Sequence, residues 1–174
     1  MSGQPQVRPD PALELLEIYD TALPRVHGYL LSRCRNRALA QDLTAETFLA
    51  AVTAARKQPT PPITTGWLIG VARHKLADHW RRAEREQRGL RLVHAAGGET
   101  ADPWDVEIDT VVAHQVLDAL GAHHRAALTL RYLDGLPVAQ VAEHLGRTVH
   151  ATEALLVRAR AAFRAAYEDP EGVR

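Results

Sequence analysis

Residues 145–160, LGRTVHATEALLVRAR, decide the fold, because their pattern predicts a tight turn followed by a helix. The shorter stretch before them, PVAQVAEHL at 137–145, has the apolar spacing of another helix. Two helices around a short turn, with Gly146 at the joint, have the layout of a DNA-binding helix-turn-helix. Thr148 is placed to cap the second helix. The end of the chain is therefore predicted to read DNA.

The composition predicts an all-α protein. The chain has 174 residues, a formal net charge of zero and 46% hydrophobic residues, and it lacks alternating strand patterns. A single cysteine, Cys34, excludes an internal disulfide framework and a Cys-rich zinc site. The absence of a signal-peptide pattern and of a membrane-length apolar run predicts a cytoplasmic location.

Breaker residues and charge divide the chain into two small helical domains joined by a flexible linker. Between Gly89 and Val111 there is one basic residue against five acidic ones, and Gly97-Gly98 interrupts any helix. We predict a disordered N-terminus, a first domain, an acidic linker, a second domain and a C-terminal tail, at residues 1–10, 11–88, 89–109, 110–168 and 169–174.

In the first domain, Asp10-Pro11 begins a helix in which Leu13, Leu16 and Leu23 are predicted to form one buried stripe. Pro24 is predicted to interrupt that helix. A Pro-rich loop at 57–66 follows the next helix, and Thr65 is predicted to cap a long helix from Trp67 to about Arg88.

The second domain is predicted to hold four helices. The first ends at Gly121, and the next spans 123–133 with Ala127, Leu130 and Leu133 facing inward. The helix-turn-helix completes the unit. The residues predicted to hold the four helices together are Val141, Leu145, Leu155 and Phe163.

Three stretches resemble the sigma factors of bacterial RNA polymerase. Residues 40–48, AQDLTAETF, resemble the family's A-E-D-L-x-Q-E-T-F stretch, and residues 67–82, WLIGVARHKLADHWRR, resemble its W-L-x-x-I-A-R-N-x-x-x-D-x-x-R-R stretch. Residues 118–146 are similar to the pattern that ends in G-L-S-x-x-E-I-A-x-x-L-G. The order, spacing and length resemble the extracytoplasmic-function (ECF) class, which keeps only regions two and four.

The resemblance implies two partners for the first domain, core RNA polymerase and the −10 promoter element. The stretch at 40–48 would dock on the polymerase through Asp42, Thr44, Glu46 and Thr47. The loop before Trp67 would hold a flipped-out base. The residues expected at −10 DNA are Thr64, Trp67, Arg73, His74, Asp78, Trp80, Arg81 and Arg82. Trp80 is predicted either to stack on bases or to pack against a neighbour.

The resemblance further implies that the second domain reads the −35 element in the major groove. The residues expected there are Arg147, Thr148, His150, Ala151, Glu153, Ala154 and Arg158. Glu153 and Leu155 replace a lysine and an arginine of the commonest family pattern. Glu153 is expected either to accept a hydrogen bond from cytosine, to face solvent, or to pair with Arg147.

An anti-sigma factor, often membrane-bound in this family, is a further expected partner. No constellation of nucleophile, base and metal ligands appears, so we expect no enzymatic activity, metal or cofactor. Two alternatives stay open at this point. One is a helix-turn-helix regulator that binds its operator without polymerase, and the other is a polymerase-binding antagonist.

Overall fold

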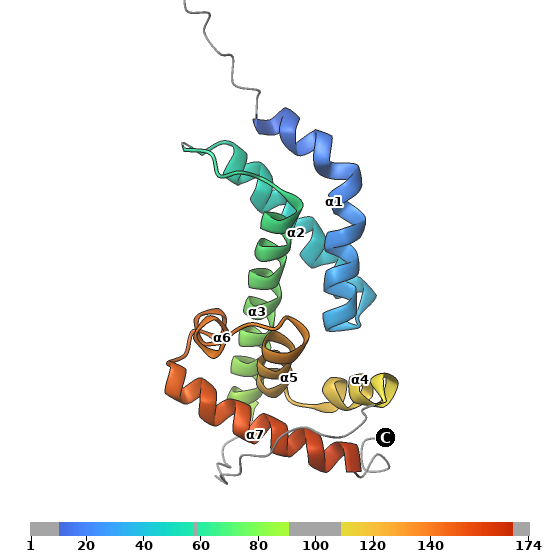
Figure 1. Cartoon of the computed structure of the whole chain (residues 1–174), viewed down its shortest axis with the longest axis vertical. Helices are drawn as coiled ribbons and strands as arrows, with labels where there is room; N and C mark the ends of the chain where they lie inside the picture. Colours follow the sequence, from blue (N-terminus) through green and yellow to red (C-terminus); the bar gives the residue numbers. More distant parts are fainter. Residues whose placement is uncertain (1–10, 58, 91–108, 169–174) are drawn as a thin grey trace, which may run out of the picture. The chain divides into compact units, whose positions relative to one another are not determined.

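The structure is a computed structural model that describes residues 11–57, 59–90 and 109–168. Every regular element in those ranges is helical, which confirms the all-α prediction (Figure 1). The elements are α1 (Pro11–Cys34), α2 (Arg37–Ala55), α3 (Thr65–Leu90), α4 (Thr110–Ala119), α5 (Ala122–Leu128), the π-helix η1 (Thr129–Leu133), α6 (Val138–Leu145) and α7 (Val149–Glu168). The predicted tails and residues 91–108 of the predicted linker lie outside the described ranges.

The chain forms two compact units that divide within α3, between Leu76 and Ala77. In the first unit α2 folds back along α1 after the connection Arg35-Asn36 (Figure 1). The Asn36 side chain accepts a hydrogen bond from the Leu39 amide at 3.0 Å and so caps α2. The buried side chains of this unit come from all three helices and include Val26, Leu30, Leu43, Phe48, Leu68 and Leu76.

Two predictions for α1 are wrong. Leu13 and Leu16 are 56% and 67% exposed, whereas Leu15 is buried. Both sets of residues recur at helical spacing, and the packing against α2 selects the stripe that continues through Val26 and Leu30. Pro24 does not interrupt the helix, because α1 continues to Cys34. A proline removes one backbone hydrogen bond, and this one lies on an exposed face of the helix.

The helix α3 begins two residues before Trp67. Its cap is Thr64 and not Thr65, since the Thr64 hydroxyl accepts a hydrogen bond from the Trp67 amide at 3.1 Å. Thr64 was expected at −10 DNA, and its hydroxyl already caps α3.

In the second unit, α4 and α7 enclose a cluster of Val116, Leu128, Ala159 and Phe163. Asp109 caps α4 by accepting hydrogen bonds from the amides of Val111 and Val112. The predicted helix at 123–133 is present as α5 followed by η1. Leu133 is 39% exposed, so its predicted inward orientation is wrong. The π-helical turn rotates the last residues away from an α-helical register.

The helix-turn-helix prediction is confirmed in detail. Gly146 adopts φ 62° and ψ 39°, the left-handed conformation that ends a helix most easily with glycine. The Thr148 hydroxyl accepts a hydrogen bond from the Ala151 amide at 3.2 Å and caps α7. The four predicted core residues, Val141, Leu145, Leu155 and Phe163, are all buried. Among the described helices, none is long and apolar enough to cross a lipid bilayer.

Candidate functional site

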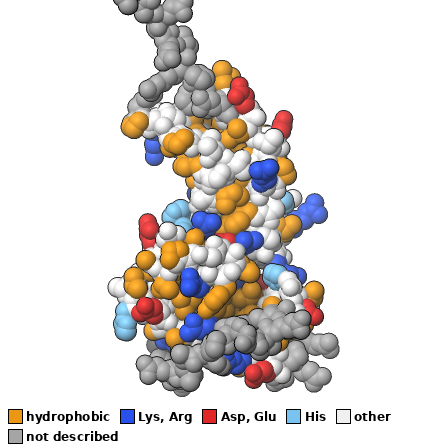
Figure 2. All heavy atoms as spheres, in the orientation of Figure 1, with side chains coloured by type: hydrophobic (Ala, Val, Ile, Leu, Met, Phe, Trp, Pro, Cys, Tyr) orange, Lys and Arg blue, Asp and Glu red, His pale blue; other side chains and the backbone are white. Residues whose placement is uncertain are grey.

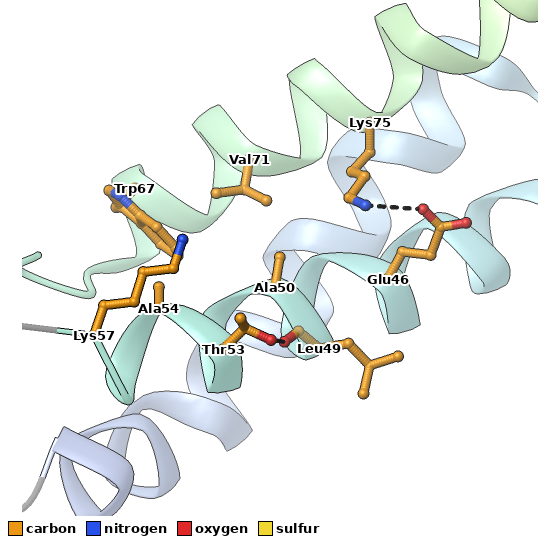
Figure 3. A pocket seen from close by; sticks show the side chains of 9 residues that line it. All are labelled: Glu46, Leu49, Ala50, Thr53, Ala54, Lys57, Trp67, Val71 and Lys75. Carbon is orange, nitrogen blue, oxygen red and sulfur yellow. Dashed lines mark hydrogen bonds and ion pairs between the residues drawn. The ribbon is translucent and has the colours of Figure 1, made fainter. Parts of the chain in front are cut away.

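The exposed face of α2 carries the two acids that were predicted to dock. Asp42 is exposed. The Glu46 carboxylate lies 3.2 Å from the Lys75 ammonium of α3, with the two side chains 45% and 32% exposed (Figure 3). Asp42 and Glu46 are four residues apart and so share one face of the helix. Asp42 is the more accessible of the two carboxylates, because Lys75 already contacts Glu46.

The structure contradicts the prediction that Thr44 and Thr47 contact a partner. Their exposed fractions are 5% and 0%. Each hydroxyl donates a hydrogen bond to a backbone carbonyl four residues earlier, at 2.6 Å to Ala40 and 2.7 Å to Leu43. A helical threonine commonly satisfies its hydroxyl in this way. These two residues therefore belong to the packing of α2 and not to its outer surface.

Sequence reasoning missed two apolar residues on the outer surface of α2. Leu49 is 66% exposed and Val52 is 39% exposed. Leu49 follows Asp42 by seven residues, or two helical turns, so both lie on the same side. That spacing was the available signal. The outer surface of α2 therefore combines carboxylates with large apolar side chains, as protein-binding surfaces often do.

Two grooves flank this face within the first unit. One, of about 480 Å³, lies between α1 and α2, where the rings of Tyr19 and Phe48 meet edge to face at 5.0 Å. The other, of about 590 Å³, lies between α2 and α3 and includes Lys57, Trp67 and Lys75 (Figure 3). Hydrophobic side chains are also visible among charged ones on the surface in Figure 2.

The residues predicted at −10 DNA lie on different faces of α3. His74 and Arg82 are exposed. The Arg73 guanidinium lies 6.0 Å from the centre of the Tyr29 ring. Asp78 and Arg81 form an ion pair three residues apart, so part of this predicted DNA surface is paired with itself.

Trp80 does not lie on an accessible surface, since only 3% of it is exposed. Of its two predicted roles, packing against neighbours is the one that the structure supports. Base stacking requires an accessible ring face and is contradicted in this conformation. Trp67 is half-buried in the groove between α2 and α3 and presents the more accessible indole.

The first turns of α7 present His150 and Glu153 to solvent. The side chain of His150 is 97% exposed and that of Glu153 is 59% exposed, with 4.0 Å between the imidazole and the carboxylate. Ala154 and Arg158 are exposed, and Ala151 is half-buried. The neighbouring Thr152 is fully buried and points away from this face.

Arg147 is held by a carboxylate within the second unit. Its guanidinium donates a hydrogen bond to Glu84 at 2.7 Å, and the two side chains are only 21% and 12% exposed. The expected alternative pairing of Glu153 with Arg147 is thus absent. To contact the −35 element as predicted, Arg147 would have to give up Glu84 for a DNA phosphate.

His124 of α5 lies near the same group of charges. Its pKa is lowered from 6.5 to about 4, chiefly by burial and further by the adjacent His123 and by Arg158, while Glu84 opposes the shift. The imidazole is therefore neutral at pH 7. Among the described residues, no group of three or more His, Cys, Asp or Glu side chains could hold a metal ion.

Comparisons with known proteins match both halves of the chain. Residues 18–86 match the family model of sigma-70 region 2, and residues 111–163 match that of sigma-70 region 4. The probable RNA polymerase sigma-C factor of Mycobacterium bovis is 36% identical over 130 residues, which cover 71% of this chain and 68% of that protein.

Two further proteins extend the comparison. The ECF RNA polymerase sigma factor BldN of Streptomyces coelicolor is 31% identical over 153 residues, which cover 82% of this chain. The match covers 56% of BldN, so the chain spans about half the length of that relative. The sigma factor RpoE from Bartonella quintana, solved in complex with the anti-sigma factor NepR, superposes with a TM-score of 0.52 at 20% identity. That match covers 91% of this chain and 96% of RpoE and shows a shared fold.

Region 2 and region 4 thus occur in this order in the chain, and region 4 contains the capped helix-turn-helix. The relatives that match the chain are RNA polymerase sigma factors. The chain belongs to the sigma-70 family of RNA polymerase sigma factors, in its ECF class.

Proposed function

We propose that this chain binds core RNA polymerase and directs it to a restricted set of promoters, with region 2 at the −10 element and region 4 at the −35 element. The observation that carries the proposal is the pairing of the two sigma regions in one chain. In this scheme residues 11–88 and 110–168 are the working modules and residues 89–109 connect them. The polymerase supplies the chemistry of RNA synthesis, and the protein acts in the cytoplasm with it.

Polymerase docking is assigned to the outer surface of α2. Asp42 supplies an exposed carboxylate, and Leu49 and Val52 supply apolar area beside it. Carboxylates select a basic partner and speed association, whereas buried apolar side chains contribute most of the affinity. This division supports docking through Asp42 with the apolar pair, and a smaller contribution from Glu46.

Promoter contacts are assigned to exposed residues of α3 and α7. In α3, His74 and Arg82 are accessible for −10 DNA. In α7, His150, Glu153 and Ala154 are accessible for the −35 element. A recognition helix reads base edges with its N-terminal residues, which is where these three lie.

An anti-sigma factor is proposed as the regulatory partner. The support is that a fold neighbour, RpoE, was solved with the anti-sigma factor NepR. Attachment of that partner to a membrane would place the inducing signal outside the cytoplasm. Co-purification from the native host, with and without detergent extraction, tests both the partner and its attachment.

The docking proposal is tested by Asp42→Arg. This change should weaken co-elution with core polymerase by at least tenfold, because it places a cation against a basic partner surface. Glu17→Arg is the matched control, with the same charge change on an exposed acid of α1. Equal binding by both variants and the wild-type protein, with unchanged circular dichroism, would remove the docking assignment.

A further inference from the structure

Arginines gather where α1 turns into α2. We call Arg33, Arg35 and Arg37 the basic turn; Arg33 lies in the last turn of α1, Arg35 lies in the connection and Arg37 begins α2. Arg33 places its guanidinium 4.8 Å from the centre of the Tyr29 ring, and Arg73 of α3 lies 6.0 Å from the same centre. Tyr29 therefore joins the basic turn to a residue of the proposed −10 helix.

Two of these arginines occupy positions that local stability disfavours. Arg35 has φ 50° and is the one non-glycine residue with positive φ in the described part of the chain. That conformation costs an L-residue about 1–2 kcal/mol, and glycine would adopt it without strain. Arg37 places a cation at the first residue of α2, where the helix dipole favours an anion instead.

The local sequence around the basic turn carries formal charge of one sign only. Between Asp20 and Asp42 the sequence has four arginines and no acidic residue. Arg35 and Arg37 are both exposed. A local concentration of guanidinium groups without acids in the same stretch favours a polyanion as the ligand, and arginine matches phosphate geometry especially well.

We propose that the basic turn contacts the phosphate backbone of promoter DNA beside the −10 element, as an extension of the surface that includes Arg73. The inference rests on the proposed function. It assigns to the α1–α2 connection a sequence-independent contact with DNA. It also explains why arginines occupy position 35, where glycine would suit the fold better, and position 37, where an acidic residue would. The competing occupant is an acidic surface of the polymerase, which the experiment separates.

The experiment uses holoenzyme assembled from core polymerase and the full chain. The probe is a 60-base-pair duplex around the strongest start site found by transcription of genomic DNA in vitro. Its affinity is measured between 0.05 and 0.3 M salt for wild type, for Arg35→Gln with Arg37→Gln, and for Arg35→Gly. Each phosphate contact contributes about 0.9 to the slope of log affinity against log salt, or about eightfold at 0.1 M.

The double variant should lower the slope by about 2 and weaken binding by up to about sixtyfold at 0.1 M salt, equally for matched and mutated −10 sequences. Arg35→Gly should lose DNA affinity while the thermal midpoint of the protein stays equal or rises, because strain at φ 50° is relieved. A merely structural arginine would show the opposite pattern. Arg25→Gln, on an exposed face of α1 two turns away, is the matched control.

An unchanged salt slope in the double variant would overturn the inference, as would a loss confined to core polymerase binding. The second result would assign the basic turn to the polymerase. Failure of the proposed function looks different, because the wild-type chain would then form no promoter complex with core polymerase at all.

Discussion

The two helices proposed to meet promoter DNA, α3 and α7, differ in their charge. The helix α3 carries basic residues along its length, and some of them are engaged with carboxylates, as in the pairs Lys75–Glu46 and Arg81–Asp78. The first two turns of α7 expose His150 and Glu153 and contain no lysine or arginine. We therefore propose that the first domain supplies most of the attraction to phosphate, and that the second domain supplies base selection with little electrostatic attraction.

The largest effect should follow from removing cations of α3. Arg73→Gln with Arg82→Gln should weaken holoenzyme binding to promoter duplex by up to about sixtyfold at 0.1 M salt, since up to two phosphate contacts are lost. Arg158→Gln in α7 should cost about eightfold or less. Filter binding or fluorescence anisotropy across a salt series provides the measurement. Equal losses of DNA affinity from the α3 and α7 variants would contradict the proposal that α3 supplies most of the attraction to phosphate.

A smaller effect, of opposite sign, should follow from adding a cation to α7. Glu153→Lys should strengthen binding about eightfold or more at 0.1 M salt, because a side chain 59% exposed changes from repelling to attracting phosphate. The preferred −35 base should change as well if the carboxylate contacts cytosine. Glu153→Gln separates the loss of charge from the gain of a cation. If Glu153→Lys neither strengthens binding nor changes preference, Glu153 lies outside the DNA interface.

The turn that presents α7 should depend on its glycine. Gly146→Ala should lower the free energy of unfolding by about 1 kcal/mol or more. The alanine would have to adopt φ 62°, and its Cβ would lie 2.9 Å from a nitrogen of Arg81. Gly28→Ala is the control, because that position lies in α1 with nothing within 4 Å of an added Cβ. It should be stabilising by up to about 1 kcal/mol. Urea titration of both variants makes the test, and a Gly146 variant as stable as wild type would contradict it.

The smallest effect concerns pH. Because the pKa of His124 is lowered to about 4, the unfolded chain takes up a proton below pH 6.5 that the folded chain does not. Stability is therefore complete above pH 6.5 and falls as the pH decreases towards 4. For this half-buried group the loss at pH 5.5 should be about 0.5–1 kcal/mol after allowance for solvent screening.

Thermal unfolding between pH 5 and 8 measures this dependence. His124→Gln should flatten it. A His124→Gln variant with the wild-type profile would show that another group titrates.

The sequence was sufficient where the structural signal is local. Gly146 and Thr148 predict the turn of the helix-turn-helix, Gly146 by its backbone preference and Thr148 by its hydrogen-bonding preference. The structure confirms both predictions. It was insufficient where the outcome depends on packing. Leu16 and Leu15 both fit a helical stripe, and only contact with α2 decides which is buried. Trp80 likewise sits among arginines in sequence, yet its indole is buried.

In the candidate site too, local patterns were predictable from the sequence and packing was not. Asp42 was predicted as an exposed docking acid and lies exposed, whereas Thr44 and Thr47 turn into the helix packing. Leu49 was missed because apolar residues on a helix are ordinarily assigned to the core. The pairing of Arg147 with Glu84 joins residues 63 positions apart, which no local pattern could indicate.

The central claim is that the chain selects promoters only together with core polymerase. The most direct measurement is transcription of fragmented genomic DNA by core polymerase, with and without the protein, followed by sequencing of the RNA 5′ ends. The account predicts a small set of start sites that require the protein, share sequence near −10 and −35, and disappear with Asp42→Arg. No protein-dependent start sites, together with a palindromic footprint made by the protein alone, would contradict it.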